Sequence, residues 1–145
     1  RTRLLNDRSD EHGPFDVIGD VHGCFGELTT LLDRLGYVFA RDAQGRAVDA
    51  RHPAGRRVVF LGDLVDRGPD VVGVLRLAMG MVAAGNAIAV PGNHEAKLVR
   101  ALRGAQVTTT HGLEETLAQL AGESPEFREA RHTLKHHPPE LLPSL

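Results

Sequence analysis

Several residue types are scarce in this chain of 145 residues, and each scarcity excludes a class of protein. Its one cysteine, Cys24, has no second thiol in the chain with which to form a disulfide. No apolar run approaches the roughly 20 residues that a membrane-spanning helix needs, because even the apolar stretch 71–84 contains Arg76. The net charge is only −2, so composition gives no support to nucleic-acid binding. We therefore expect a cytoplasmic protein that does not associate with membranes.

What is present indicates one globular domain over residues 1–145. Hydrophobic residues make up 41% of the chain and charged residues 25%, as in ordinary folded domains. After a polar leader or linker over residues 1–13, the patterns alternate as strand, helix, insertion, strand, helix, strand and helix. That alternation predicts an α/β fold, a mostly parallel sheet with covering helices. Buried strands are expected over residues 15–18, 57–61 and 86–90.

The remaining elements follow from helical spacing and turn signals. Helices are predicted over 24–35 and from Pro69 to the stop at Gly85, and two more over 113–120 and 125–135. Between 37 and 55 the pattern is irregular around the turn signal Asp42-Ala43-Gln44-Gly45, which indicates a surface hairpin. The chain opens on Arg1 and stops at Leu145 after a proline-rich run. We therefore expect a partial domain, cut from a longer protein.

Three clusters of polar residues follow the three predicted strands, at positions 20–23, 62–68 and 92–95. Parallel strands place their carboxyl ends at one edge of a sheet, where α/β proteins bind ligands. In the first cluster, Asp20 and His22 are two residues apart and would project to the same side. A carboxylate and an imidazole there could share one cation, although Asp-x-His alone is equally consistent with a surface loop.

The second cluster supplies a second carboxylate and a candidate phosphate-binding cation. Asp63 follows its strand as Asp20 follows the first, so the two carboxylates would repel each other unless cations lie between them. Asp63 is therefore the candidate bridging ligand. Asp66 and Arg67 could form an exposed ion pair, but a guanidinium beside a metal pair is well suited to bind a phosphate.

In the third cluster, Asn93 offers a neutral oxygen ligand and is also a candidate N-cap of the next helix. His94 would lie beside the phosphate and could act as a general acid toward the leaving oxygen, with Asp66 holding its ring. Glu95 is as consistent with a first-turn helix residue as with a chemical role, and we leave it out of the predicted site.

Together the three clusters resemble the N-terminal half of the calcineurin-like, phosphoprotein-phosphatase-type metallophosphoesterases. The segments GPFDVIGDVHGC at 13–24 and VPGNHEAKL at 90–98, with THGL at 110–113, resemble more narrowly the phosphatase module of bacterial polynucleotide kinase-phosphatase. The resemblance implies Asp20 and His22 on one metal, Asp63 bridging and Asn93 on the second metal. It also implies Arg67 on phosphate and His94 with Asp66 near the leaving group.

The family pattern also includes histidine ligands in an Ala-His-Ala-Gly-like strand and a Gly-His loop, and neither segment occurs in this sequence. The later histidines are predicted to be surface or packing residues: His111, His132, His136 and His137. The predicted ligand set is therefore incomplete, with about three ligands for one metal and two for the other, which favours weak or partial occupancy.

These observations lead to one main functional hypothesis and two alternatives. The main hypothesis is a two-metal phosphomonoesterase that removes terminal 2′ or 3′ phosphates from RNA or DNA ends, in a longer chain with kinase and ligase domains. The expected cofactor is a pair of divalent ions. Mixed oxygen and nitrogen donors suit manganese, iron, zinc or cobalt. Manganese is the metal that we expect, with nickel, cobalt, iron and zinc as alternatives. The alternatives are a protein serine/threonine phosphatase or dinucleoside-polyphosphate hydrolase, and a catalytically silent domain.

Overall fold

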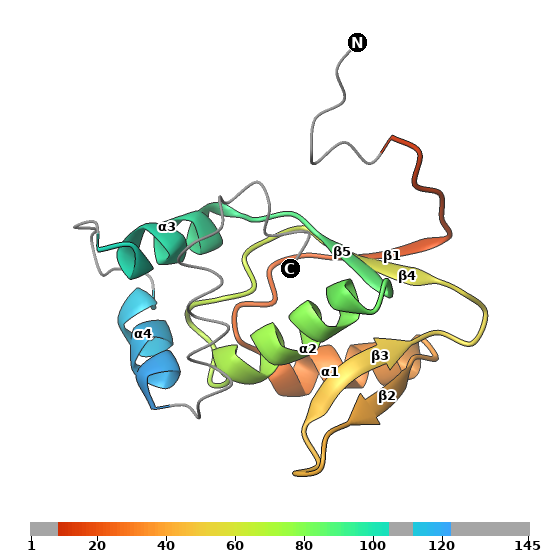
Figure 1. The fold of residues 1–145 in the computed structure, drawn as a ribbon, viewed down its shortest axis with the longest axis horizontal. Helices are drawn as coiled ribbons and strands as arrows, with labels where there is room; N and C mark the ends of the chain where they lie inside the picture. Colours follow the sequence, from red (N-terminus) through yellow and green to blue (C-terminus); the bar gives the residue numbers. More distant parts are fainter. Residues whose placement is uncertain (1–8, 105–111, 123–145) are drawn as a thin grey trace.

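The computed structural model describes residues 9–104 and 112–122 (Figure 1). The elements along the chain are β1 (Phe15–Ile18), α1 (Phe25–Arg34), β2 (Val38–Arg41), β3 (Ala47–Arg51), β4 (Arg57–Phe60), α2 (Val71–Ala83), β5 (Ala87–Ala89), α3 (Asn93–Leu102) and α4 (Leu113–Ala121). The predicted α/β order is confirmed, and each expected strand is present within one residue at either end. The predicted helix over 125–135 lies outside the described residues.

A parallel sheet carries the three polar clusters. Its strand order is β1-β4-β5, so β4 lies at the centre with a parallel neighbour on each side. Ile18 of β1 is in register with Phe60 of β4, and Phe60 with Ala89 of β5. The three strands therefore end at the same level, and the loops that follow them leave the sheet side by side.

The core lies between this sheet and helices α1 and α2, which Figure 1 shows on one side of it. Phe60, Leu32, Leu77 and Met81 have no exposed surface. Side chains alternate along a strand, so in β1 Ile18 is buried while Val17 points to the opposite face and is 61% exposed. Burial of this one apolar face is the main force that fixes the strands and hence the loop positions.

The irregular segment is a hairpin, as predicted. Strands β2 and β3 pair antiparallel, and Asp42 closes the turn by accepting hydrogen bonds from the backbone N–H groups of Gln44 and Arg46. Helix α2 packs against β3, so the hairpin is part of the core layer. Near the start of the parallel sheet, Tyr37 donates a 2.7 Å hydrogen bond to Asp16 of β1.

Helix α2 begins later than predicted. Asp70 is its N-cap and accepts a 2.8 Å hydrogen bond from Gly73 N, so Pro69 precedes the helix and is not part of its first turn. Within the described residues, no helix combines the length and apolar character needed to cross a bilayer.

Candidate metal centre

The loops after β1 and β4 bring three metal-ligand types together. One side-chain ligand atom from each of Asp20, His22 and Asp63 lies within 4.8 Å of the other two. His22 Nε2 is 3.9 Å from Asp20 Oδ1, and the Asp20 side chain is 82% exposed. The predicted proximity of these residues is confirmed, and the spacing is that of donors able to share a cation.

The tautomer of His22 suits this role. Its Nδ1 lies 3.0 Å from the carbonyl oxygen of Val65, which can only accept a hydrogen bond. The ring proton therefore sits on Nδ1, and Nε2, on the Asp20 side, keeps its lone pair for a cation. No sequence pattern indicates this partner, because any residue at position 65 offers the same carbonyl.

The backbone of the two loops is held in an unfavourable conformation. Asp20, His22, Asp63, Asp66 and Arg67 have φ angles between 45° and 73°, and they are all the non-glycine residues with positive φ in the described part of the chain. Such residues cost about 1–3 kcal/mol each and cluster at functional sites. Backbone hydrogen bonds between the loops hold them there, from His22 N to Asp63 O (2.9 Å) and from Gly23 N to Leu64 O (2.8 Å).

The loop after β5 approaches the second cluster so closely that only glycine fits. A Cβ on Gly62 would collide with the backbone of Gly92, and a Cβ on Gly92 would collide with the Asp63 carboxylate. This approach lets the backbone N–H of His94 donate to Asp63 Oδ1 at 3.3 Å. The carboxylate of Asp63 is thereby oriented by the loop after β5, and it is partly exposed.

Glu95, which the sequence analysis left out of the predicted site, holds the backbone of two of the loops that form it. It is buried, and its two carboxylate oxygens accept from Gly92 N (2.9 Å), Leu64 N (2.9 Å) and Val65 N (3.3 Å). Burial raises the pKa of Glu95 despite these hydrogen bonds. One side chain therefore joins the loops after β4 and β5. The sequence feature that could have indicated this role is the motif Gly-Asn-His-Glu, in which Glu95 stands three residues after the N-cap Gly92.

His94 lies beside the triad and is paired as predicted. Its Nδ1 is 2.7 Å from Asp66 Oδ2, and its ring contacts that of His22 edge to face, with centroids 4.7 Å apart. Asp66 has no exposed surface, and Thr116 of α4 donates a 2.6 Å hydrogen bond to Asp66 Oδ1. The carboxylate therefore holds the Nδ1 proton of His94, which leaves the opposite nitrogen for a substrate.

Asn93 and Arg67 are both exposed. Asn93 is the first residue of α3, and Gly92 is the N-cap, so the alternative that Asn93 caps this helix is wrong. Asn93 stands immediately before His94, whose backbone N–H contacts Asp63. Arg67 follows Asp66 in the loop that supports His94. Their roles as ligand and phosphate-binding residue stay predictions.

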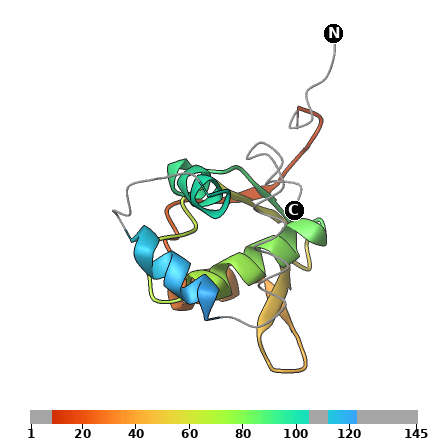
Figure 2. The ribbon, with the colours of Figure 1, turned by 60° about the vertical axis from the view of Figure 1, so that its left-hand side comes forward.

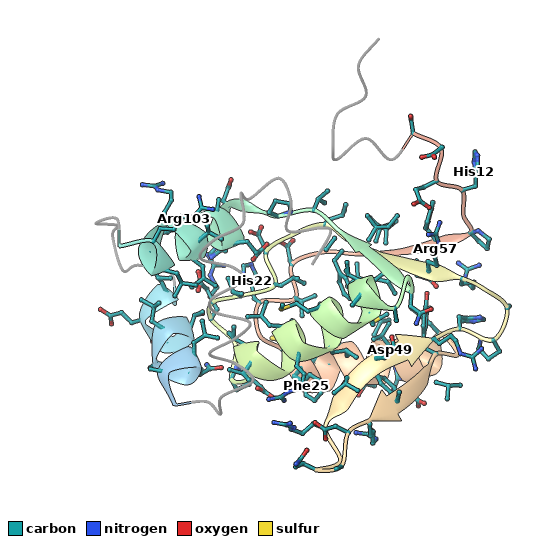
Figure 3. All side chains as sticks on the ribbon, in the orientation of Figure 1. His12, His22, Phe25, Asp49, Arg57 and Arg103 are labelled. Atoms are coloured by element: carbon teal, nitrogen blue, oxygen red, sulfur yellow. The ribbon has the colours of Figure 1, made fainter. Side chains whose placement is uncertain are left out.

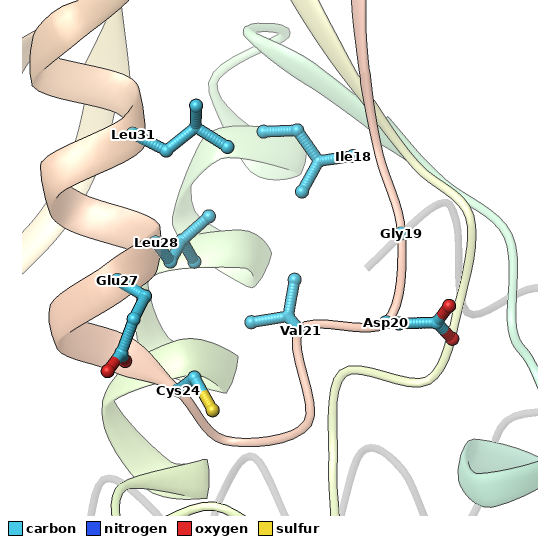
Figure 4. Close-up of a pocket in the computed structure, with 8 residues that line it drawn as sticks. All are labelled: Ile18, Gly19, Asp20, Val21, Cys24, Glu27, Leu28 and Leu31. Carbon is cyan, nitrogen blue, oxygen red and sulfur yellow. The ribbon is translucent and has the colours of Figure 1, made fainter.

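A trough of about 300 Å³ lies on the other side of the first loop, between β1 and α1. Ile18, Val21, Leu28 and Leu31 give it an apolar lining, and Figure 4 shows the Asp20 carboxylate pointing away from these side chains. In Figure 3, His22 lies instead among the loops between α2 and α3. The trough therefore adjoins the metal-ligand cluster at Asp20, while its apolar side chains lie away from that carboxylate.

The family follows from comparison with known sequences. The profile described as calcineurin-like phosphoesterase matches residues 13–140. The chain belongs to this family. Metal ions of the binuclear divalent type that the family uses fit the donor set present here, because two carboxylates and an oriented imidazole meet at one edge of the sheet.

Individual relatives have a narrower name in common. A bis(5′-nucleosyl)-tetraphosphatase PrpE [asymmetrical] from Halalkalibacterium halodurans is 48% identical over 114 residues, which are 79% of this chain and 44% of the relative. The protein of the same name from Bacillus subtilis (strain 168) is 45% identical over 73% of the chain and 41% of its own length. The chain thus spans less than half the length of these relatives.

A solved structure agrees with these sequences. It is a crystal structure of a protein provisionally assigned as a diadenosine tetraphosphatase, with a TM-score of 0.52 and 28% identity over 87% of this chain and 43% of the other. The calcineurin-like resemblance is confirmed, but the narrower resemblance to polynucleotide kinase-phosphatase is not supported. The main hypothesis of terminal phosphate removal from polynucleotides is therefore wrong, and the dinucleoside-polyphosphate alternative is favoured.

Proposed function

We propose that this chain carries the metal-binding loops of a phosphohydrolase that cleaves dinucleoside polyphosphates asymmetrically. The observation that carries the proposal is the meeting of Asp20, His22 and Asp63 beside the His94–Asp66 pair. The names of the relatives supply the substrate class. The chain matches less than half the length of these relatives, so the presence of the complete activity in this chain is part of the proposal.

The residues divide into three roles. Asp20, His22, Asp63 and Asn93 would hold two divalent ions, with manganese the expected metal. Bound divalent ions supply Lewis acidity for the attacking water and neutralise phosphate charge. Arg67, exposed beside the site, would bind a phosphate through its guanidinium. A cytoplasmic setting in which Cys24 stays a thiol is part of this proposal.

The bond changes balance without a covalent enzyme intermediate. The oxygen of one water forms a bond to a terminal phosphorus of the tetraphosphate bridge as that water loses a proton to solvent, and the bond from that phosphorus to its bridging oxygen breaks. Protonated His94 would stabilise or protonate that departing oxygen, while Asp66 accepts the Nδ1 hydrogen bond. The products of an asymmetric cut are one nucleoside triphosphate and one nucleoside monophosphate.

The test uses diadenosine tetraphosphate with the purified chain and manganese. Separation of the products by chromatography should show ATP and AMP in equal amounts, and none after chelation of the metal. Two equivalents of ADP would contradict the asymmetric cut. If the chain neither binds manganese in calorimetry nor cleaves the substrate, the alternative of a catalytically silent domain is correct.

A further inference from the structure

The turn formed by Asp66, Arg67 and Gly68 needs external support. Asp66 and Arg67 are consecutive non-glycine residues in the left-handed region, with φ angles of 70° and 73°. Residues with a Cβ are disfavoured in this region, so the turn does not keep this shape through its own preferences. Its shape matters because it aims the Asp66 carboxylate at His94.

Helix α4 supplies that support from about 50 positions further along the chain. Figure 2 shows α4 beside the start of α2, where the turn lies. Thr116 accepts a hydrogen bond from Asp66 N at 3.0 Å and donates to Asp66 Oδ1 at 2.6 Å. Gln119 accepts from Val71 N at 2.8 Å and donates to Gly68 O at 3.3 Å. Two side chains on one face of α4 thus bind both sides of the turn.

The N-terminus of α4 fits against the same turn. Gly112, its N-cap, lies so close to the backbone of Arg67 that a Cβ would collide with Arg67 N. Leu113 and Leu120 are buried in the core, which anchors the helix independently of the polar contacts. The polar contacts are therefore not needed to attach α4, and they point instead to a role in the turn.

We propose that Thr116 is a positioning residue for His94. With its backbone N–H and Oδ1 both bonded to Thr116, Asp66 keeps one rotamer, in which Oδ2 faces His94 Nδ1. The imidazole is then fixed with its proton on Nδ1 and its other nitrogen toward the substrate. Without the hydroxyl, a wholly buried carboxylate oxygen loses its partner and the side chain has reason to turn away. This inference rests on the proposed function for its catalytic consequence only.

The test compares Thr116→Val, which keeps the side-chain shape and removes the hydroxyl, with Thr116→Ser, which restores it. Substrates are a matched pair of nucleoside 5′-phosphate esters, one with phenol and one with p-nitrophenol as leaving group. Thr116→Val should lower kcat for the phenyl ester about 10- to 100-fold, with a smaller loss for the nitrophenyl ester and KM within about twofold. Thr116→Ser should recover kcat to within about threefold of the original chain.

A second readout does not need turnover. Nitrogen NMR of the His94 ring in its neutral form should show the Nδ1–H tautomer in the original chain and Thr116→Ser, and a mixture of tautomers in Thr116→Val. Thr116→Ala replaces Thr116→Val if the latter does not fold. Unchanged kcat and tautomer in the variant, or equal losses in Val and Ser, would overturn the inference. Tautomer changes as expected in a chain that cleaves no dinucleoside polyphosphate would uphold the positioning role and refute the proposed function.

Discussion

The aspartates near the two ends of strand β1, Asp16 and Asp20, differ in burial and in their bonding partners. Asp16, in the strand, accepts hydrogen bonds from Arg56 (2.8 and 3.1 Å) and from Tyr37, and its side chain is 11% exposed. Asp20, four residues later, is 82% exposed, and the ion pair found for it in the described chain is with His22 at 3.9 Å. The Asp16 carboxylate has hydrogen-bond donors on both of its oxygens, whereas the Asp20 carboxylate is exposed and can accept a cation. The difference separates a residue that holds the fold from one that the fold presents to a ligand.

Backbone conformation separates the two ends in the same way. Asp20, His22 and Asp63 have left-handed φ angles, while Asp16 lies in regular parallel pairing with Val58. Repulsion between carboxylates and a strained backbone both destabilise the metal-free chain, so they need a compensating interaction. A bound divalent ion would supply that compensation at the end that carries both the left-handed backbone and the exposed Asp20 carboxylate.

The largest effect is expected from Asp63→Asn, matched with Asp16→Asn at the opposite end. Asp63→Asn should lower manganese-dependent hydrolysis by about a thousandfold or more, because a ligand and a negative charge are lost together. Its metal-free chain should be at least as heat-stable as the original, since one of two facing carboxylates is removed. Asp16→Asn should reverse both results, with near-normal activity and a lower thermal midpoint. Similar activity in the two variants would break the comparison.

His94→Gln should lower kcat by about 100- to 10,000-fold with little change in metal affinity, the loss typical of a general acid. His52→Gln is the matched control, because His52 bonds to the Leu35 carbonyl and lies against Tyr37, near the Asp16 cluster. Steady-state rates measure the change in kcat, and calorimetric titration with manganese measures the change in metal affinity. A His94→Gln chain with normal kcat would exclude His94 from the reaction.

Glu95→Gln tests the support beneath the metal loops. Both carboxylate oxygens accept from backbone N–H groups, and an amide can replace only one of them, so the free energy of unfolding should fall by about 1–3 kcal/mol. Because burial raises the folded-state pKa of Glu95, its stabilising contribution is complete below the ordinary value of 4.5 and is lost as pH rises through the raised pKa. Urea titrations at several pH values should show this slope in the original chain and not in the variant.

The smallest effect concerns the Asp16 cluster in acid. The hydrogen bond from Arg56 is the main cause that holds the pKa of Asp16 below its ordinary value. The stabilisation by this group is therefore present above pH ~4 and is lost as pH falls through the lowered pKa. Asp16→Asn should lower the thermal midpoint by roughly 2–4 °C at pH 7 and by less at pH 3. An equal difference at both pH values would show that the charge is unimportant.

The sequence predicted the part of the site that local rules govern. Strand patterns placed Asp20, Asp63 and Asn93 after parallel strands, and the register of β1, β4 and β5 confirms that the three loops emerge together. The hairpin was predicted from one turn signal. These features depend on periodicity and on turn chemistry, which neighbouring residues determine.

The contacts that orient the site were missed because they depend on tertiary structure. Thr116 is 50 positions from Asp66, and nothing near it in the sequence marks it as a partner of a carboxylate. The Val65 carbonyl is invisible in any side-chain pattern, and Glu95 resembled an ordinary first-turn residue. The substrate class was predicted wrongly because the three clusters encode metal and phosphate chemistry, which hydrolases of several substrates share.

Manganese binding by the chain, measured by calorimetry in parallel with the Asp63→Asn variant, tests most directly whether the fold brings Asp20 and Asp63 together to hold divalent ions. We expect saturable binding to the original chain, a rise of its thermal midpoint with metal, and loss of both in Asp63→Asn. Equal binding by the two chains, or no binding by the original chain at millimolar manganese, would contradict the account.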